Sequence, residues 1–193
     1  MTMKPIPPSL ASLLLLTAVA SAQTLTLHTR SQEKNDRNDR KFVTRERVQR
    51  WLPEETAIVV CDMWDQHWCQ GATRRVAELA PRMNAVLTEA RKRGVLIIHC
   101  PSACVDFYKD TPMYQLAQRA PKVETTIPLQ DWCHVNPERE PPLPIDDSDE
   151  GCDCQPRCPL GHPWTRQIAT LEIQAGDAIT DSAQAFYLMK QRG

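Results

Sequence analysis

The chain has 193 residues, of which 41% are hydrophobic, so it is long enough for one domain with a buried core and too short for two comfortable ones. Its formal net charge is −1, and this balance gives no reason to expect nucleic acid or an anionic membrane as a partner. Composition therefore indicates a single globular domain, without the charge excess of a nucleic-acid-binding protein.

The N-terminal residues contain the three parts of an export signal in order. Lys4 supplies a positive charge, Leu13 to Leu16 lie within an apolar run, and Ala20-Ser21-Ala22 ends the run with small residues, as a signal peptidase requires. We predict a signal peptide over residues 1–22 and export to the periplasm or the cell exterior. A membrane anchor or a buried helix is the alternative, but the run is too short to span a bilayer core of about 30 Å. We expect no membrane contact after cleavage.

Residues 23–50 are polar and highly charged. Thr24, Thr26 and His28 alternate with leucines, which predicts a short strand. Residues 30–50 then carry eight basic and four acidic side chains. We predict a solvated connector here, with phosphate binding as the alternative.

From residue 51 onward the pattern is that of an α/β domain. The run from Ala57 to Cys61 is continuously apolar, as in a parallel strand covered on both faces. Apolar residues then recur three and four apart from Val76 to Ala90, which predicts a helix that Pro81 begins or kinks. Gly94 suits a C-terminal cap, and Val95 to His99 form a second apolar run. We predict a right-handed βαβ unit in a three-layer α/β fold with a mostly parallel sheet.

In the rest of the chain a long irregular segment lies between regular elements. Thr111-Pro112 can begin a helix, and prolines, acidic residues and four cysteines gather in residues 133–163. We predict a long irregular excursion over those residues. Leu171 to Ile173 and Ala178-Ile179 suggest strands, and a last helix is expected between Asp181 and Arg192.

Three segments carry a resemblance to a known family. Residues 59–68 read VVCDMWDQHW, residues 82–95 contain RMN and RGV, and residues 177–193 run from DAI to RG. In this order they resemble the N-terminal portion of the isochorismatase-like cysteine hydrolases, the superfamily that includes nicotinamidase. The resemblance implies a Rossmann-like isochorismatase-like domain over residues 51–193, incomplete at its C-terminus, that acts on a small-molecule substrate and is compatible with homo-oligomers. The implied reaction is hydrolysis of a carbon–nitrogen bond in a small non-peptide amide.

The resemblance also implies which residues form the site. The family aspartate corresponds to Asp62, at the end of the first predicted strand. The family's nucleophilic cysteine belongs to a strand that would follow Gly193, so we expect this chain to be inactive as it stands. Arg166 is the only basic residue where the family has a lysine, and its fixed charge makes it a poor substitute.

We expect aromatic and histidine side chains around Asp62. Trp64, His67 and His99 are the candidates for a substrate pocket. The alternative readings are structural. Asp62 would then be a helix cap or an ion-pair partner, and His99 would be a hydrogen-bonded residue at a strand end.

The cysteines offer a further possibility. Cys152, Cys154, Cys158 and His162 are soft ligands in a compact set that could hold zinc, although export favours disulfides among the first three and Cys133. Cys69 and Cys104 follow the two predicted strands and could form another disulfide. No other metal or cofactor is expected. The rival functions are a noncatalytic exported binding module on the same fold and a small Cys-rich metal-binding protein.

Overall fold

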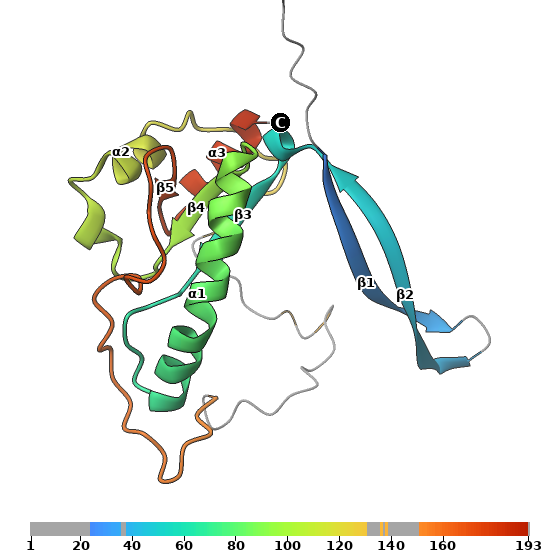
Figure 1. Cartoon of the computed structure of the whole chain (residues 1–193), viewed down its shortest axis with the longest axis horizontal. Coiled ribbons are helices and arrows are strands. Elements are labelled where there is room, and N and C mark those ends of the chain that lie inside the picture. The colour runs from blue at the N-terminus through green and yellow to red at the C-terminus, as the bar shows by residue number, and fades with distance from the viewer. Residues whose placement is uncertain (1–23, 36–37, 131–135, 137, 139–150, 193) are drawn as a thin grey trace, which may run out of the picture.

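A computed structural model describes residues 24–35, 38–130, 136, 138 and 151–192. The predicted signal peptide, Cys133 and residues 139–150 of the predicted excursion lie outside the described residues. Figure 1 shows a body formed by a small sheet and its helices, from which a long two-stranded hairpin projects.

The sheet of the body is parallel and has the order β3-β4-β5. Strands β3 (Ala57–Cys61) and β4 (Leu96–Cys100) pair in parallel over their whole length, and β5 (Ala178–Ile179) pairs in parallel with β4. Every residue of β4 is buried, because this strand lies between two others and its apolar run has no polar face. The prediction of an α/β fold with parallel strands is confirmed.

Helices cover the apolar residues of this sheet. Successive residues of β4 alternate between two buried clusters, as side chains of a strand alternate between its faces. One cluster contains Leu87 of helix α1 (Gln70–Lys92), and the other contains residues of α2 (Pro112–Gln118) and α3 (Gln184–Arg192). Burial of apolar area on both faces therefore holds the strand ends in place.

Helix α1 begins earlier than its apolar period indicates. Pro81 lies inside the helix, so of its two predicted roles, a start or a kink, the first is wrong. At the other end Gly94 has a φ of 88°, the left-handed conformation that glycine adopts readily after a helix, and its predicted role is confirmed. Among the described residues no helix is long and apolar enough to cross a membrane.

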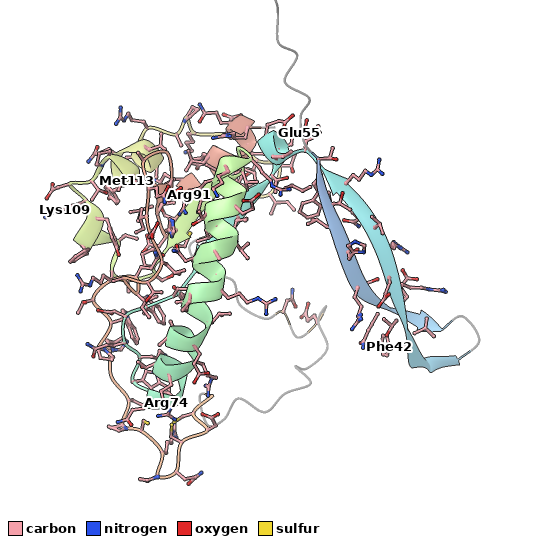
Figure 2. All side chains as sticks on the ribbon, viewed as in Figure 1. Phe42, Glu55, Arg74, Arg91, Lys109 and Met113 are labelled. Atoms are coloured by element: carbon pink, nitrogen blue, oxygen red, sulfur yellow. The ribbon has the colours of Figure 1, made fainter. Side chains whose placement is uncertain are left out.

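The charged residues before the domain form a hairpin, and the prediction of a loop there is wrong. Strands β1 (Leu25–Asn35) and β2 (Asn38–Trp51) pair antiparallel. Ion pairs cross between them: Arg30 to Glu46 at 2.8 Å and Arg47 to Glu33 at 2.6 Å. The start of β1 contains the predicted short strand, but the charged residues that follow it find their partners only across the hairpin, which the sequence of one strand does not reveal. The hairpin is still solvated, and Figure 2 shows Phe42 exposed near its far end.

The described end of the predicted excursion, residues 151–163, is irregular, as predicted. Residues 151–163 contain no helix or strand, and an isolated antiparallel bridge joins Trp64 to Gln167. Leu171 to Ile173 are not a strand, which corrects that prediction. Leu171 is buried in the core cluster next to α1 instead, so its apolar character reflects packing without a ladder of backbone hydrogen bonds.

Candidate functional site

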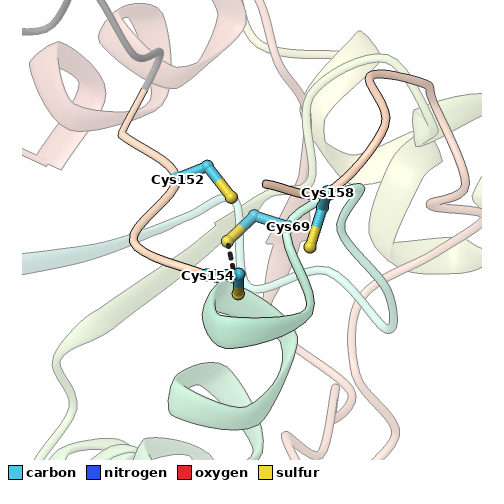
Figure 3. Close-up of side chains that lie close together, drawn as sticks. All are labelled: Cys69, Cys152, Cys154 and Cys158. Carbon is cyan, nitrogen blue, oxygen red and sulfur yellow. Dashed lines mark hydrogen bonds between the residues drawn. The ribbon is translucent and has the colours of Figure 1, made fainter. Parts of the chain in front are cut away.

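Four cysteine side chains converge at the N-terminal end of α1 (Figure 3). They are Cys69, Cys152, Cys154 and Cys158, and their sulfur atoms all lie within 4.8 Å of one another. The Sγ atoms of Cys69 and Cys154 are 3.9 Å apart. Three of the four residues are buried and Cys154 is half-buried. The arrangement has the ligand type and closeness of a site for a thiophilic metal ion.

Two distant parts of the chain supply these thiols. Cys69 is the residue immediately before α1, while the other three cysteines lie on the irregular segment that passes across the helix end. Gly71, in the first turn, permits this close approach. A Cβ atom there would lie 2.8 Å from Asp153 Oδ1 and 3.3 Å from Cys154 Sγ, so any larger residue would displace the segment that carries the ligands.

The helix end favours thiolates at this site. The backbone N–H of Gln70 donates to Cys158 Sγ at 3.4 Å, and that of Gly71 donates to Cys154 Sγ at 3.3 Å. These donors and the positive end of the α1 dipole stabilise negative charge on sulfur. Backbone N–H groups of Cys158 and Cys154 lower the pKa of Cys152 to about 7.

The thiols also oppose one another's ionisation. The N–H of Ala72 favours the thiolate of Cys69, but burial and the neighbouring thiols of Cys152 and Cys154 outweigh it, so the pKa of Cys69 is raised. Crowded thiols cannot all ionise without a compensating positive charge. A metal cation among the four sulfurs would provide that charge.

The cysteine cluster corrects the ligand set proposed from the sequence. His162 is not one of the clustered residues; its ring packs edge-on against Trp164 at 4.8 Å. Cys69 takes the fourth position, and Cys104 does not approach it: the Cys104 thiol donates to the Pro101 carbonyl oxygen. All seven described cysteines are free thiols.

Asp62 lies at the carboxyl end of β3, as predicted. Its backbone has a φ of 51°, unusual for a residue other than glycine. Its carboxylate is exposed and accepts the backbone N–H of Ser102 at 3.0 Å, in the turn that follows β4. Strained conformations of this kind concentrate at functional sites, and ligands of open α/β sheets bind beyond the carboxyl ends of strands.

A second carboxylate lies at the same edge of the sheet. Asp181 follows β5 and accepts the N–H of Ala103 at 3.3 Å, and Ala103 has a φ of 60°. The turn after β4 therefore contacts one carboxylate on each side. The sequence indicated only that Asp181 lies at the start of the last helix, because its position across from Asp62 depends on how β5 pairs.

Arg166 lies beside Asp65 and Phe107. Its guanidinium lies 4.0 Å from Asp65 and stacks over the ring of Phe107 at 5.5 Å. Burial alone would raise the pKa of Asp65, but hydrogen bonds from the Thr165 hydroxyl and backbone N–H outweigh it, so the pKa is lowered. Asp65 thus remains an anion that anchors the segment carrying Arg166.

Trp64 and His67 lie together, as expected of residues that share a pocket. The Trp64 ring stacks on Trp164 at 4.5 Å and on His67 at 5.9 Å. The indole N–H of Trp64 donates to the carbonyl oxygen of Ser102 at 3.1 Å. The stack therefore connects His67, which contacts Cys69 of the cluster, to the turn after β4 that hydrogen-bonds Asp62. Trp164 was not singled out from the sequence, since no local pattern connects it with Trp64.

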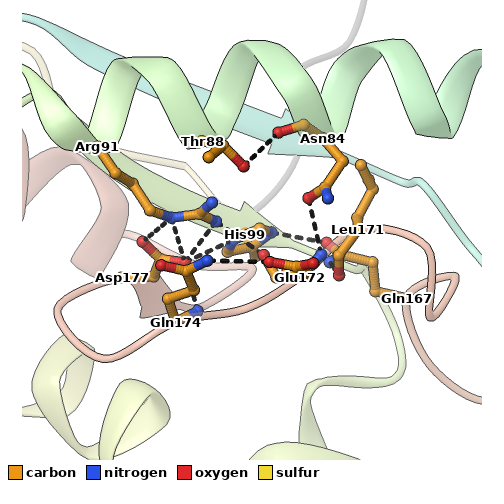
Figure 4. Close-up of polar contacts among 9 residues, drawn as sticks. All are labelled: Asn84, Thr88, Arg91, His99, Gln167, Leu171, Glu172, Gln174 and Asp177. Carbon is orange, nitrogen blue, oxygen red and sulfur yellow. Dashed lines mark hydrogen bonds and ion pairs between the residues drawn. The ribbon is translucent and has the colours of Figure 1, made fainter.

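His99 belongs to the core and not to a pocket, which corrects its predicted place. Its side chain is fully buried, with Nδ1 2.8 Å from Gln167 Oε1 and Nε2 3.2 Å from Asp177 Oδ2. Arg91 of α1 donates to the same Asp177 carboxylate at 2.7 Å (Figure 4). The structural reading of His99 is the correct one: this network fastens α1 and the segment before β5 to the central strand.

Two thiols near Asp62, those of Cys100 and Cys104, are poor nucleophiles. Burial, together with the nearby Cys61, Asp181 and Asp62, raises the pKa of Cys100 to about 12. Burial, together with Asp65, Asp62 and Asp181, raises the pKa of Cys104 to about 11. Since the thiolate is the reactive form, neither residue is prepared for attack on a carbonyl carbon.

Comparison with known proteins adds no further information on this site. No protein-family model, curated protein or solved structure matches the chain significantly. The function of the chain is therefore inferred from its residues and their geometry.

Proposed function

We propose that the chain binds zinc through Cys69, Cys152, Cys154 and Cys158. The observation that carries this proposal is the convergence of the four sulfur atoms within 4.8 Å. A tetrahedral zinc site with Zn–S bonds of about 2.3 Å requires sulfur atoms about 3.8 Å apart, and the Cys69 and Cys154 sulfurs are 3.9 Å apart. Small side-chain rotations would bring the wider pairs to that spacing.

The ion we propose has a structural role. Four thiolates complete the tetrahedral coordination of zinc and leave no position for water or substrate, as in structural sites of other proteins. The segment that supplies three of the ligands has no helix or strand between residues 151 and 163. Metal binding therefore supplies stability that backbone hydrogen bonding does not provide in this segment.

Metal analysis tests this proposal directly. Residues 23–193, produced under reducing conditions with zinc supplied, should carry one zinc ion per chain by mass spectrometry of the native protein. Replacement of zinc by cobalt should give the intense thiolate-to-cobalt absorption and the visible bands of a tetrahedral sulfur site. Protein without bound metal in which the four cysteines are joined as disulfides would contradict the proposal.

A second candidate function is suggested by the position of Asp62. The resemblance to isochorismatase-like hydrolases implies that this residue is the family's general base. The protein would then be an exported hydrolase with a three-layer fold that cleaves a carbon–nitrogen bond of a small amide. The exposed, strained carboxylate of Asp62, hydrogen-bonded to the Ser102 N–H, supports this candidate. A noncatalytic binding module on the same fold is the alternative. Arg166 stands where the family has a lysine, and the Cys100 and Cys104 thiols, with their raised pKa values, do not replace the family's nucleophile.

We expect residues 23–193 to show no amidase turnover above that of the Asp62→Asn variant. The physical reason is that Cys100 and Cys104 have pKa values raised to about 12 and about 11, so neither of these thiols supplies a thiolate at neutral pH. The measurement is ammonia release from a panel of small amides, nicotinamide among them. Turnover that disappears on Asp62→Asn would show that a thiol within residues 23–193 acts as the nucleophile.

A further inference from the structure

The cysteine cluster joins two segments that then run side by side (Figure 1). Residues 62–69 lead from β3 to α1, and residues 158–167 run back from the cluster to the sheet. At the sheet end the segments are joined by the backbone hydrogen bond from Asp65 N–H to Arg166 O at 2.9 Å. At the other end they meet in the cluster, where Cys158 lies close to Cys69 and accepts the backbone N–H of Gln70.

A groove of about 770 Å³ lies between these segments next to the cluster. This volume is within the range of small-molecule sites, about 300–1,000 Å³. One wall includes His67, Trp68 and Arg74 from the start of α1 and the loop before it, and the other includes Leu160 and His162. Among the described residues that line it, Arg74 is the only one with a full positive charge and none is acidic.

The ring groups of the groove combine flat faces with hydrogen-bond donors. His67 stacks on Trp164 at 5.7 Å and packs against Trp68 at 5.1 Å. Its Nδ1 accepts the backbone N–H of Cys69 at 3.1 Å, so in the neutral ring Nε2 carries the hydrogen.

We propose that this groove binds a planar aromatic carboxylate, and that metal binding at the cysteine cluster creates the site. The indole and imidazole faces suit a flat ring, and the Arg74 guanidinium can bind a carboxylate through two parallel hydrogen bonds. Figure 2 shows Arg74 at the N-terminal end of α1, where the helix dipole also favours an anion. No acidic side chain lies in the described lining, so the groove offers no carboxylate to pair with a cation.

The dependence on metal follows from how the second wall is tethered. Residues 159–163 lie between the ligand Cys158 and the stacked Trp164, and Leu160 remains largely exposed. Without the metal the Cys158 end of this wall keeps only weak contacts among the described residues: the N–H groups of Gln70 and Gly71 on the cysteine sulfurs and the exposed Arg75–Asp153 ion pair. We therefore expect the groove to lose its width and depth. This inference therefore rests on the proposed zinc centre.

Benzoate is the probe that tests the groove. Titration into zinc-loaded residues 23–193 should give a saturable change in tryptophan fluorescence and in amide chemical shifts of residues 66–74. Benzylamine, which has the same ring with a positive charge, should give none. The Arg74→Gln variant should bind benzoate about tenfold more weakly or worse, since one charge-assisted pair is lost. Arg82→Gln is the matched control, because Arg82 is an exposed residue of the same helix that does not line the groove, and it should bind normally.

Chelation and reloading separate the two proposals. Zinc content is measured first, and zinc-depleted protein should lose benzoate binding and regain it when zinc is restored. Equal benzoate binding with and without zinc would overturn the dependence on metal. Zinc bound without any benzoate binding would overturn the groove while leaving the zinc centre intact, and protein that never binds zinc would overturn both.

Discussion

Replacing Cys69 with serine should weaken zinc binding by at least about 100-fold. Loss of a residue that only hydrogen-bonds to a metal ligand already lowers metal affinity by about 10–100-fold, and loss of a ligand itself should cost more. Cys69 contributes one of the four clustered sulfurs and is the ligand that ties the irregular segment to α1. Loss of that tie should also release residues 151–163, since they have no helix or strand of their own. Competition with a chromophoric chelator measures the affinity, and hydrogen exchange measures the release.

The matched control for this substitution is Cys61→Ser. Cys61 is an exposed free cysteine at the end of β3 and is not among the clustered residues. It should leave zinc affinity and exchange of residues 151–163 unchanged. Equal loss of zinc in both variants would mean that the metal binds elsewhere, and unchanged affinity in Cys69→Ser would remove Cys69 from the ligand set.

The Asp177→Asn substitution should lower the free energy of unfolding by about 3–5 kcal/mol, the usual effect of removing one partner from a buried ion pair. The Asp177 side chain is 3% exposed and that of Arg91 is 12% exposed. The variant would leave the Arg91 guanidinium buried beside a neutral amide. Arg91 Nη1 already has no hydrogen-bond partner among the described residues, so little remains to compensate. Urea unfolding followed by circular dichroism measures the change.

A surface ion pair at the C-terminal end of α1 provides the control. Glu89 pairs with Arg93 at 2.8 Å, and both side chains are partly exposed. Glu89→Gln should therefore cost less than about 1 kcal/mol. If both variants lost the same small amount, the buried network in Figure 4 would not be a main support of the fold.

The same carboxylate predicts how stability depends on pH. Burial alone would raise the pKa of Asp177, but hydrogen bonds from His99, Arg91 and the Gln174 backbone N–H outweigh it and lower the pKa to about 2. A lowered pKa means that the folded state favours the ionised form, so this contribution is complete above the ordinary pKa near 4 and is lost as the pH falls toward 2. Stability measured between those pH values should fall less steeply in Asp177→Asn than in the unaltered protein.

The local parts of the fold could be predicted from the sequence. Continuous apolar runs at residues 57–61 and 95–99 indicated buried parallel strands, and the helix between them followed from residues three and four apart. Gly94 was correctly assigned because its left-handed φ is a requirement of the helix end itself. In each case the signal lies within a few residues and reports the burial of one element.

Features that depend on pairing were predicted poorly. The hairpin of β1 and β2 was taken for a loop, since its charges are matched only across the strands. His99 was placed in a pocket, although it is fully buried with polar partners from residues 167 and 177. Those partners are more than sixty residues away in the chain, and no local pattern reports them.

The candidate metal centre divides in the same way. By itself, the sequence determined that Cys152, Cys154 and Cys158 lie close enough together to bind a metal, because a short spacing limits how far apart their sulfurs can be. Only the tertiary structure decided that Cys69, and not His162, completes the set. The reason is physical: the passage of residues 151–158 across the N-terminal end of α1 depends on how the helix packs on the sheet and on the space left by Gly71. Contact between positions 69 and 154 is a property of that packing and has no signature in sequence spacing.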